Sequence, residues 1–344
     1  MPRSHRRFSV PSAHARRLHA AAWAAAAAAL TVAALPAAAL AQRPVEGVAR
    51  GDSLFRRGRV FAAESAYYDA ARHTPRDPAA RLALGRYLAS RGALRIGAVL
   101  MEEARFFGGD PRTIGLELAP VYARLGDYRS LAALPGSPLS AAERARAEWL
   151  RDHPPAAEGP DSVTVAYEPQ GAAGAAGGLG RVTLALGGES VVATIDPAVR
   201  GLVLDSAWLR RTEAVKAFPP RVGGKPGADA PAVAIAPKLG AMTLANVPTR
   251  LAPLGGVRSA RVGLDVLSDL AATFDEPGRT LTLRRAGRLA PAATGTHLAT
   301  ISLPSGVWLA TAAGTTALAV DRGRAPLRGK RWTVDRRRGE IVVQ

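Results

Sequence analysis

A gapless repeat of about 34 residues runs through residues 44–135 and constrains the fold of this chain more than any other feature. Three sets of positions coincide at this spacing: Gly51, Gly85 and Ala119; Leu54, Leu88 and Tyr122; and Gly58, Gly92 and Gly126. Small residues at fixed offsets let the two helices of a unit approach closely, so the period predicts helix–turn–helix units. Pro75 and Pro111 fall where one unit passes to the next.

The first unit resembles a tetratricopeptide repeat, because several of its residues occupy the offsets that mark this family. They are Gly51, Leu54, Gly58, Ala63, Tyr67, Ala70 and Pro75. The second unit departs from the pattern at Gly97, and the third departs after Tyr128. The resemblance implies an α-solenoid of about three repeats within residues 44–152. Either its concave face binds a peptide, or the repeats only dock on the part of the chain that follows.

Two local signals mark the end of this helical part. Ser140-Ala-Ala-Glu143 is a capping box, which predicts a last helix through about Arg151. Pro154-Pro155 then begins a change in composition, so we take residues 153–160 as a linker. Beyond the linker the patterns are those of strands.

The stretch Val191–Leu204 contains two apolar runs that flank Asp196, Pro197 and Ala198. A hairpin leads into it, predicted from the pair Gly187-Gly188, since paired glycines supply the positive φ of a tight turn. A carboxylate at the end of an apolar strand is costly unless it is paired, hydrogen-bonded or neutral. Asp196 is therefore either a turn-capping residue or a candidate catalytic group.

A series of short patterns follows in order. It consists of the hairpin, Asp196 with its turn to Gly201-Leu-Val-Leu204, a helix from Ser206 to about Val215, a flap at Val222, Gly223 and Gly224, Leu244-Ala-Asn-Val-Pro248, Val262-Gly-Leu-Asp-Val-Leu267, and a hairpin over Thr273–Leu283. In this order the patterns resemble the retropepsin-type aspartic peptidases of bacteria, over roughly residues 161–285. The resemblance implies a closed β domain of the acid-protease type at residues 161–288.

The active site implied by the resemblance is altered in this chain. In that family two Asp-Thr-Gly or Asp-Ser-Gly turns bring two carboxylates together, about 3 Å apart, and the pair shares a proton. Asp196 matches the catalytic position, but Pro197 replaces the hydroxyl residue and Ala198 replaces the glycine. Proline has no hydroxyl and no N–H, and the alanine Cβ obstructs close approach. We also expect Arg200 to hold Asp196 in a structural ion pair.

Two functions are consistent with these residues. The altered turn favours a catalytically impaired protein that binds peptides or proteins, or acts in assembly, through the concave helical face and the groove under the flap. The alternative is an active homodimeric aspartic endopeptidase that uses Asp196 from each subunit. Dimerisation through the retropepsin-like part is therefore an open expectation.

A second carboxylate within the same chain is not predicted. The segment around Asp321 and Gly323 echoes the motif, and residues 333–343 echo the terminal strand, but too few residues separate the two echoes for a second lobe. We therefore predict that residues 289–344 are a β extension packed on the peptidase-like part. Other aspartates receive structural roles: Asp265 begins a helix, Asp269 is solvated and Asp275 lies in a turn.

The first 41 residues predict a secretory signal peptide. They combine an acid-free basic head, an alanine-rich apolar run from Ala20 to Leu35 and a small-x-small cleavage site at Ala39-Leu-Ala41. Removal of the five leader arginines lowers the formal net charge from +18 to +13. We predict export, to a periplasm, where little nucleic acid is met. The basic surface leaves contact with a membrane surface or an acidic polymer open.

Absent residue types exclude most enzyme chemistries. The chain has no cysteine, which removes disulfides, thiol catalysis and cysteine-ligated zinc. His73, His153 and His297 remain after processing and are not spaced as metal ligands. Phosphate-binding glycine loops and nucleophile elbows are also missing from the sequence. We therefore expect no cofactor and no metal.

Overall fold

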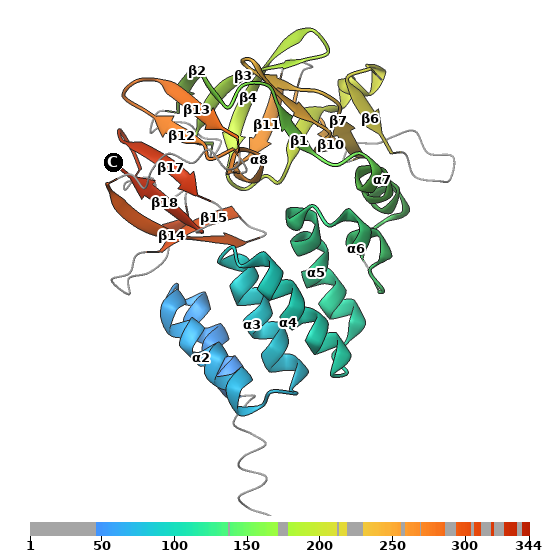
Figure 1. Cartoon of the computed structure of the whole chain (residues 1–344), viewed down its shortest axis with the longest axis vertical. Coiled ribbons are helices and arrows are strands. Elements are labelled where there is room, and N and C mark those ends of the chain that lie inside the picture. Colours follow the sequence, from blue (N-terminus) through green and yellow to red (C-terminus); the bar gives the residue numbers. More distant parts are fainter. Residues whose placement is uncertain are drawn as a thin grey trace, which may run out of the picture.

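The computed structural model places a helical region before a large mixed β-sheet domain (Figure 1). It describes residues 46–136, 138–170, 178–211, 213–218, 230–255, 259–268, 270–285, 294–303, 306–310, 318–319, 327–335 and 339–344. The predicted signal peptide, the flap residues Val222, Gly223 and Gly224, and Asp269, Asp321 and Gly323 lie outside these residues. Within the described ranges, no helix is both long enough and apolar enough to cross a bilayer.

The helical region consists of short helices that pack side by side along the chain (Figure 1). A first helix covers residues 46–56. The others are α2 (Val60–His73), α3 (Pro78–Ser90), α4 (Leu94–Phe106), α5 (Pro111–Leu125), α6 (Tyr128–Ala133) and α7 (Ala141–Asp152). The predicted capping box begins α7, with the Ser140 side chain accepting from the Glu143 N–H and Glu143 accepting from the Ser140 N–H.

One set of repeat glycines lies in the turns between helices. Gly58, Gly92 and Gly126 have φ of +73°, +92° and +69°, a left-handed conformation that glycine adopts without steric cost. Helix packing explains a second pair, because a Cβ added to Gly97 of α4 would lie 2.7 Å from the carbonyl oxygen of Gly85 in α3. The repeated glycines thus permit the turns, and Gly85 and Gly97 permit a close contact between helices.

The β domain is a mixed sheet that closes into a barrel. Its elements are β1 (Ala156–Glu158), β2 (Ser162–Pro169), β3 (Gly180–Leu186), β4 (Glu189–Asp196), β5 (Leu202–Asp205), η1 (Ser206–Arg210), β6 (Val215–Ala217), β7 (Ala230–Ala234), β8 (Lys238–Leu239), β9 (Met242–Ala245), β10 (Val247–Ala252), β11 (Ser259–Gly263), α8 (Leu264–Ser268), β12 (Thr273–Asp275) and β13 (Thr280–Arg284). The predicted hairpin joins β3 to β4, with Gly187 and Gly188 at φ +55° and +80°. Ser206 begins a short 3₁₀ helix, so the longer helix expected to about Val215 is wrong. Val215 instead begins strand β6.

The C-terminal segment adds β14 (Thr296–Leu303), β15 (Gly306–Ala310), β16 (Leu318–Ala319), β17 (Arg331–Asp335) and β18 (Glu340–Val343). Strand β17 pairs with β12, and the buried rings of Phe274 and Trp332 stack with centroids 3.9 Å apart. The segment also reaches the helices, since Arg91, the C-cap of α3, donates to the Thr300 carbonyl at 3.2 Å and Ile301 packs on Val60. It therefore connects the β domain to the helical region.

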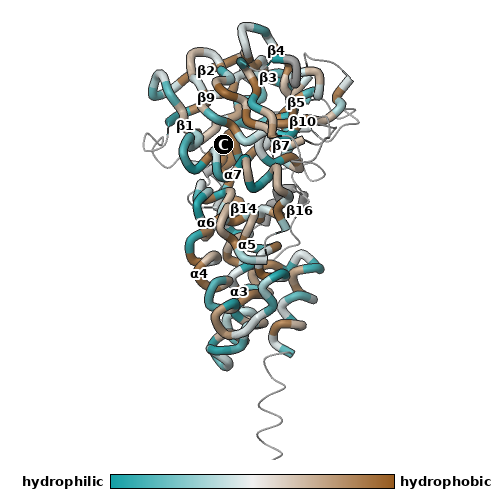
Figure 2. The backbone as a smooth tube through the Cα atoms, turned by 90° about the vertical axis from the view of Figure 1, so that its right-hand side faces the viewer, coloured by the Kyte–Doolittle hydropathy of each residue, from teal (hydrophilic) through white to brown (hydrophobic). Residues whose placement is uncertain are grey.

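A second connection lies on the other side of the molecule. Helix α7 contacts β7, and Arg146 of α7 donates to the carbonyl of Thr249 in β10 at 2.9 Å. Figure 1 shows the two connections on opposite sides, with α7 on one side and β14 on the other. Figure 2, turned by 90°, shows the β domain at one end of the long axis, and α5 and β14 between it and α3. The helical region and the β domain are thus joined at two separate places.

Candidate functional site: an arginine-lined cleft beside Asp196

Asp196 is the last residue of β4, a strand held on both sides. β4 pairs with β3 in the hairpin and runs parallel to β11, where Gly263 lies opposite Asp196. Ala193 and Ile195 are fully buried in the core, and this packing fixes the end of the strand. Asp196 itself is only 6% exposed. The sequence thus places a buried carboxylate at the end of an apolar strand.

Both oxygens of the Asp196 carboxylate have donors. Oδ1 accepts from the Ala198 N–H at 2.9 Å, and Oδ2 lies 3.4 Å from Nη1 of Arg261. The predicted ion pair with Arg200 is wrong, because Arg261 of β11 occupies that role. The register explains the difference: β11 runs alongside β4, whereas Arg200 lies beyond the turn. The contacts are those of a turn-capping carboxylate with one partly exposed ionic partner.

The turn after Asp196 is tied to a second aspartate. The Gly201 N–H donates to both oxygens of Asp265, at 3.1 and 3.0 Å. Gly201 has φ +66°, and a Cβ there would collide with the carbonyl oxygen of Pro248. Asp265 lies in the first turn of α8, as predicted, and Asp275 accepts from the Gly278 N–H in a turn. The link from Asp265 to Gly201 was not predicted, because only the folded topology brings the two together.

Three cavities lie between this turn and the helical region. The largest, about 1070 Å³, is bounded by α5, α6 and α7 on one side, and by the turn and β10 on the other. A second, about 380 Å³, extends along the helices to residues such as Tyr67, and a third, about 70 Å³, reaches the C-terminal strands. Arg124 and Arg200 line all three, so we treat them together as the central cleft.

Some of the predicted site residues line this cleft and others do not. Pro197 lines the smallest cavity, and Ala198 lines the smallest and the largest. Asp196 is absent from the described residues that line these three cavities. Val222, Gly223 and Gly224, predicted as the flap, lie outside the described residues. The turn is therefore open to the cleft, while the carboxylate is turned into the domain.

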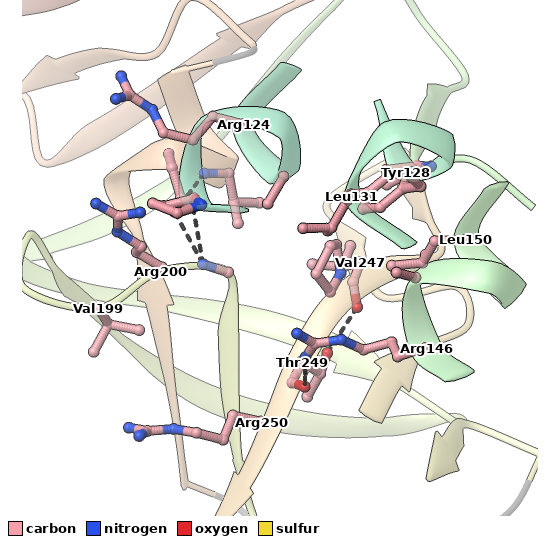
Figure 3. Close-up of a pocket in the computed structure, with 18 of the residues that line it drawn as sticks. Arg124, Tyr128, Leu131, Arg146, Leu150, Val199, Arg200, Val247, Thr249 and Arg250 are labelled. Carbon is pink, nitrogen blue, oxygen red and sulfur yellow. Dashed lines mark hydrogen bonds between the residues drawn. The ribbon is translucent and has the colours of Figure 1, made fainter. Parts of the chain in front are cut away.

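Basic side chains dominate the charge of the largest cavity. Arginines at 124, 146, 200, 250 and 285 line it, with Glu143 and Asp265 as the lining carboxylates. Figure 3 shows Arg124, Arg200 and Arg250 extending to the same side, and the bond from Arg146 to Thr249. The sequence did not predict this set, because its members lie far apart along the chain and no local pattern marks them.

Two of these arginines are electrostatically perturbed. Burial lowers the pKa of the Arg200 guanidinium, and the charge of Asp265 opposes that shift. Burial also lowers the pKa of Arg146. Arg200 is nevertheless exposed, because it lines the cleft. A partly dehydrated cation in a cleft is favourable for binding an anionic group.

Among the described residues, no group of three His, Asp or Glu side chains lies close enough together to bind a metal ion.

Comparison with known proteins does not assign a family to this chain. No family model and no curated protein matches the sequence. Among solved structures, a crystal structure of a retropepsin-like aspartic protease from Rickettsia conorii is similar over 39% of this chain and 94% of that chain, at 12% identity and a TM-score of 0.25. A TM-score this low assigns neither fold nor function.

Proposed function

We propose that this protein is an exported binding or assembly protein, in which tetratricopeptide-like repeats are joined to a retropepsin-like domain without peptidase activity. The 34-residue register with its left-handed glycines supports the repeats. The ordered motifs support the retropepsin-like part, together with the position of Asp196 at a strand end beside β11 and α8. One observation carries the functional proposal: the turn after Asp196 faces the helical region of its own chain.

The contacts of Asp196 argue against catalysis. An aspartic dyad needs a second carboxylate close enough to share a proton, so that one group activates water and the other protonates the leaving group. In the described part of the chain, the groups that contact this carboxylate are the Ala198 N–H and Arg261. Both are donors, and neither can supply the missing acid. Asp196 therefore serves to hold the turn in place.

A second subunit is also hindered from supplying the partner carboxylate. The smallest cavity is lined by Pro197 and Ala198, by Ser90 and Gly92 of the helical region, and by Gly339 and Ile341 of the C-terminal segment. A homodimer that joined two Asp196 turns would have to displace both of these parts. The active homodimeric peptidase remains the second candidate, and the retention of Asp196 is the observation that favours it.

A peptidase assay tests the proposal. Wild type, Asp196→Asn and the double variant Pro197→Thr/Ala198→Gly are incubated with an unfolded protein substrate from acid to neutral pH. We expect no cleavage by any of the three, because restoring the turn does not bring in a second carboxylate. Cleavage by wild type that is lost in Asp196→Asn would overturn the proposal in favour of the peptidase.

Export is proposed from the predicted signal peptide of residues 1–41. N-terminal sequencing of the protein from a cell envelope fraction should begin at or near Gln42. A mature chain that keeps Met1 in the cytoplasm would contradict this part of the proposal.

A further inference from the structure

The central cleft has the size and composition of a binding site. Ligand pockets in proteins typically measure about 300–1,000 Å³ and combine apolar walls with a few polar groups that orient the ligand. The largest cavity, about 1070 Å³, lies just above this range. Its apolar walls come from both parts of the chain and include Leu116, Leu131, Leu150, Val203, Leu244 and Val247. An occupant would therefore contact the helical region and the β domain together.

Arg200 is a cation of the cleft that is available to a ligand. Within the described part of the chain it makes no hydrogen bond and no ion pair, and Asp265, the carboxylate that acts on it electrostatically, is already bound to the Gly201 N–H. The carboxylates of the second cavity are also engaged, since Asp52 and Glu117 both pair with Arg86. Arg200 thus presents a guanidinium whose donors are unused.

Neighbouring arginines are oriented by main-chain carbonyls. Arg146 donates to Thr249, Arg124 to Ala89 at 3.1 Å, and Arg285 to Gly159 at 2.8 Å. A carbonyl acceptor fixes the direction of a guanidinium without cancelling its charge. Glu143 and Asp265 offset part of this charge, but five arginines line the cavity, so the potential is positive and a ligand with several carboxylates matches it best.

The apolar walls of the largest cavity indicate which kind of anionic ligand fits it. A polyphosphate or an acidic polysaccharide carries charged or polar groups along its whole length, and these would lose hydration against leucine and valine side chains. A peptide that alternates acidic and aliphatic residues satisfies both the arginines and the walls. We propose that the central cleft binds an acidic, aliphatic peptide segment and that Arg200 is its main anion-binding residue. This inference rests on the proposed non-catalytic binding function.

Binding is measured by fluorescence anisotropy with a labelled peptide of alternating leucine and glutamate, and with its glutamine counterpart. We expect the glutamate peptide to bind more tightly, and salt to weaken its binding. Arg200→Gln should lower its affinity about tenfold, the effect of one charge-assisted contact. Arg181→Gln is the matched control, because this exposed arginine of β3 lies outside the three cavities and should bind like wild type. Thermal melting checks that both variants are folded.

Three outcomes would overturn the inference: equal binding of the glutamate and glutamine peptides, equal losses in Arg200→Gln and Arg181→Gln, or tighter binding of a short polyphosphate than of the peptide. The affinities are also measured in the Asp196→Asn background, so that peptide cleavage cannot obscure them. Cleavage of the bound peptide by wild type alone would contradict the proposed function, whereas the affinities in Asp196→Asn would still decide the inference. The two failures are thus distinguishable.

Discussion

At the scale of single residues, the proposed function makes Asp196 a structural group, and its substitutions should change stability rather than activity. Asp196→Ala removes the bond to the Ala198 N–H and the contact with Arg261, and leaves these donors unpaired. We expect it to lower the free energy of unfolding by about 1–3 kcal/mol. Asp196→Asn should cost less, because its carbonyl can still accept from Ala198 and because the half-exposed Arg261 contributes little as an ionic partner.

Urea denaturation measures the free energies of unfolding, which should fall from wild type to Asp196→Asn to Asp196→Ala. Asn and Ala variants that are both as stable as wild type would contradict a structural role for the carboxylate. The Arg261→Gln variant is the matched control for the ionic contact and should cost no more than Asp196→Asn.

At the scale of elements, local sequence patterns predicted those turns and helix ends that depend on residues close together in the chain. The Gly187-Gly188 hairpin and the capping box at Ser140 depend on neighbours within a few residues, and both were predicted correctly. The contacts between Arg261 and Asp196, and between Asp265 and Gly201, join residues more than sixty positions apart. Such pairs depend on which strands become neighbours, which no single stretch encodes. The ion pair predicted with Arg200 was wrong for this reason.

The turn glycines allow a test of the helical register. Gly92→Val should lower the free energy of unfolding by at least about 1–2 kcal/mol, because a β-branched residue is strained at φ +92°. The expected cause is the left-handed backbone conformation of this turn glycine. Gly92→Asn is the matched control and should cost less, since asparagine tolerates this region better. Thermal melting that places Gly92→Val at or above Gly92→Asn would contradict the assignment of this glycine to a left-handed turn.

At the scale of the whole molecule, the packing of the helical region against the β domain brings the arginines of the cleft together. The arginines of the cleft come from α5, α7, the turn after β4, β10 and the residue just after the end of β13, and they meet because α7 and the C-terminal segment hold the two parts together. The sequence contained each arginine but no signal for their convergence. Domain packing is set by scattered contacts such as Val60 with Ile301, which have no periodic pattern.

The central claim is that the turn after Asp196 faces the helical region of its own chain rather than a second copy. Because the chain has no cysteine, Ala198→Cys carries a single spin label on an exposed residue of that turn. Leu116→Cys, on the exposed α5 residue that lines the largest cavity, supplies a second label. Electron–electron double resonance should give one intramolecular distance for the doubly labelled protein and none for Ala198→Cys alone. A short distance between Ala198→Cys labels of two molecules would mean that the turns meet in a dimer, and would contradict the account.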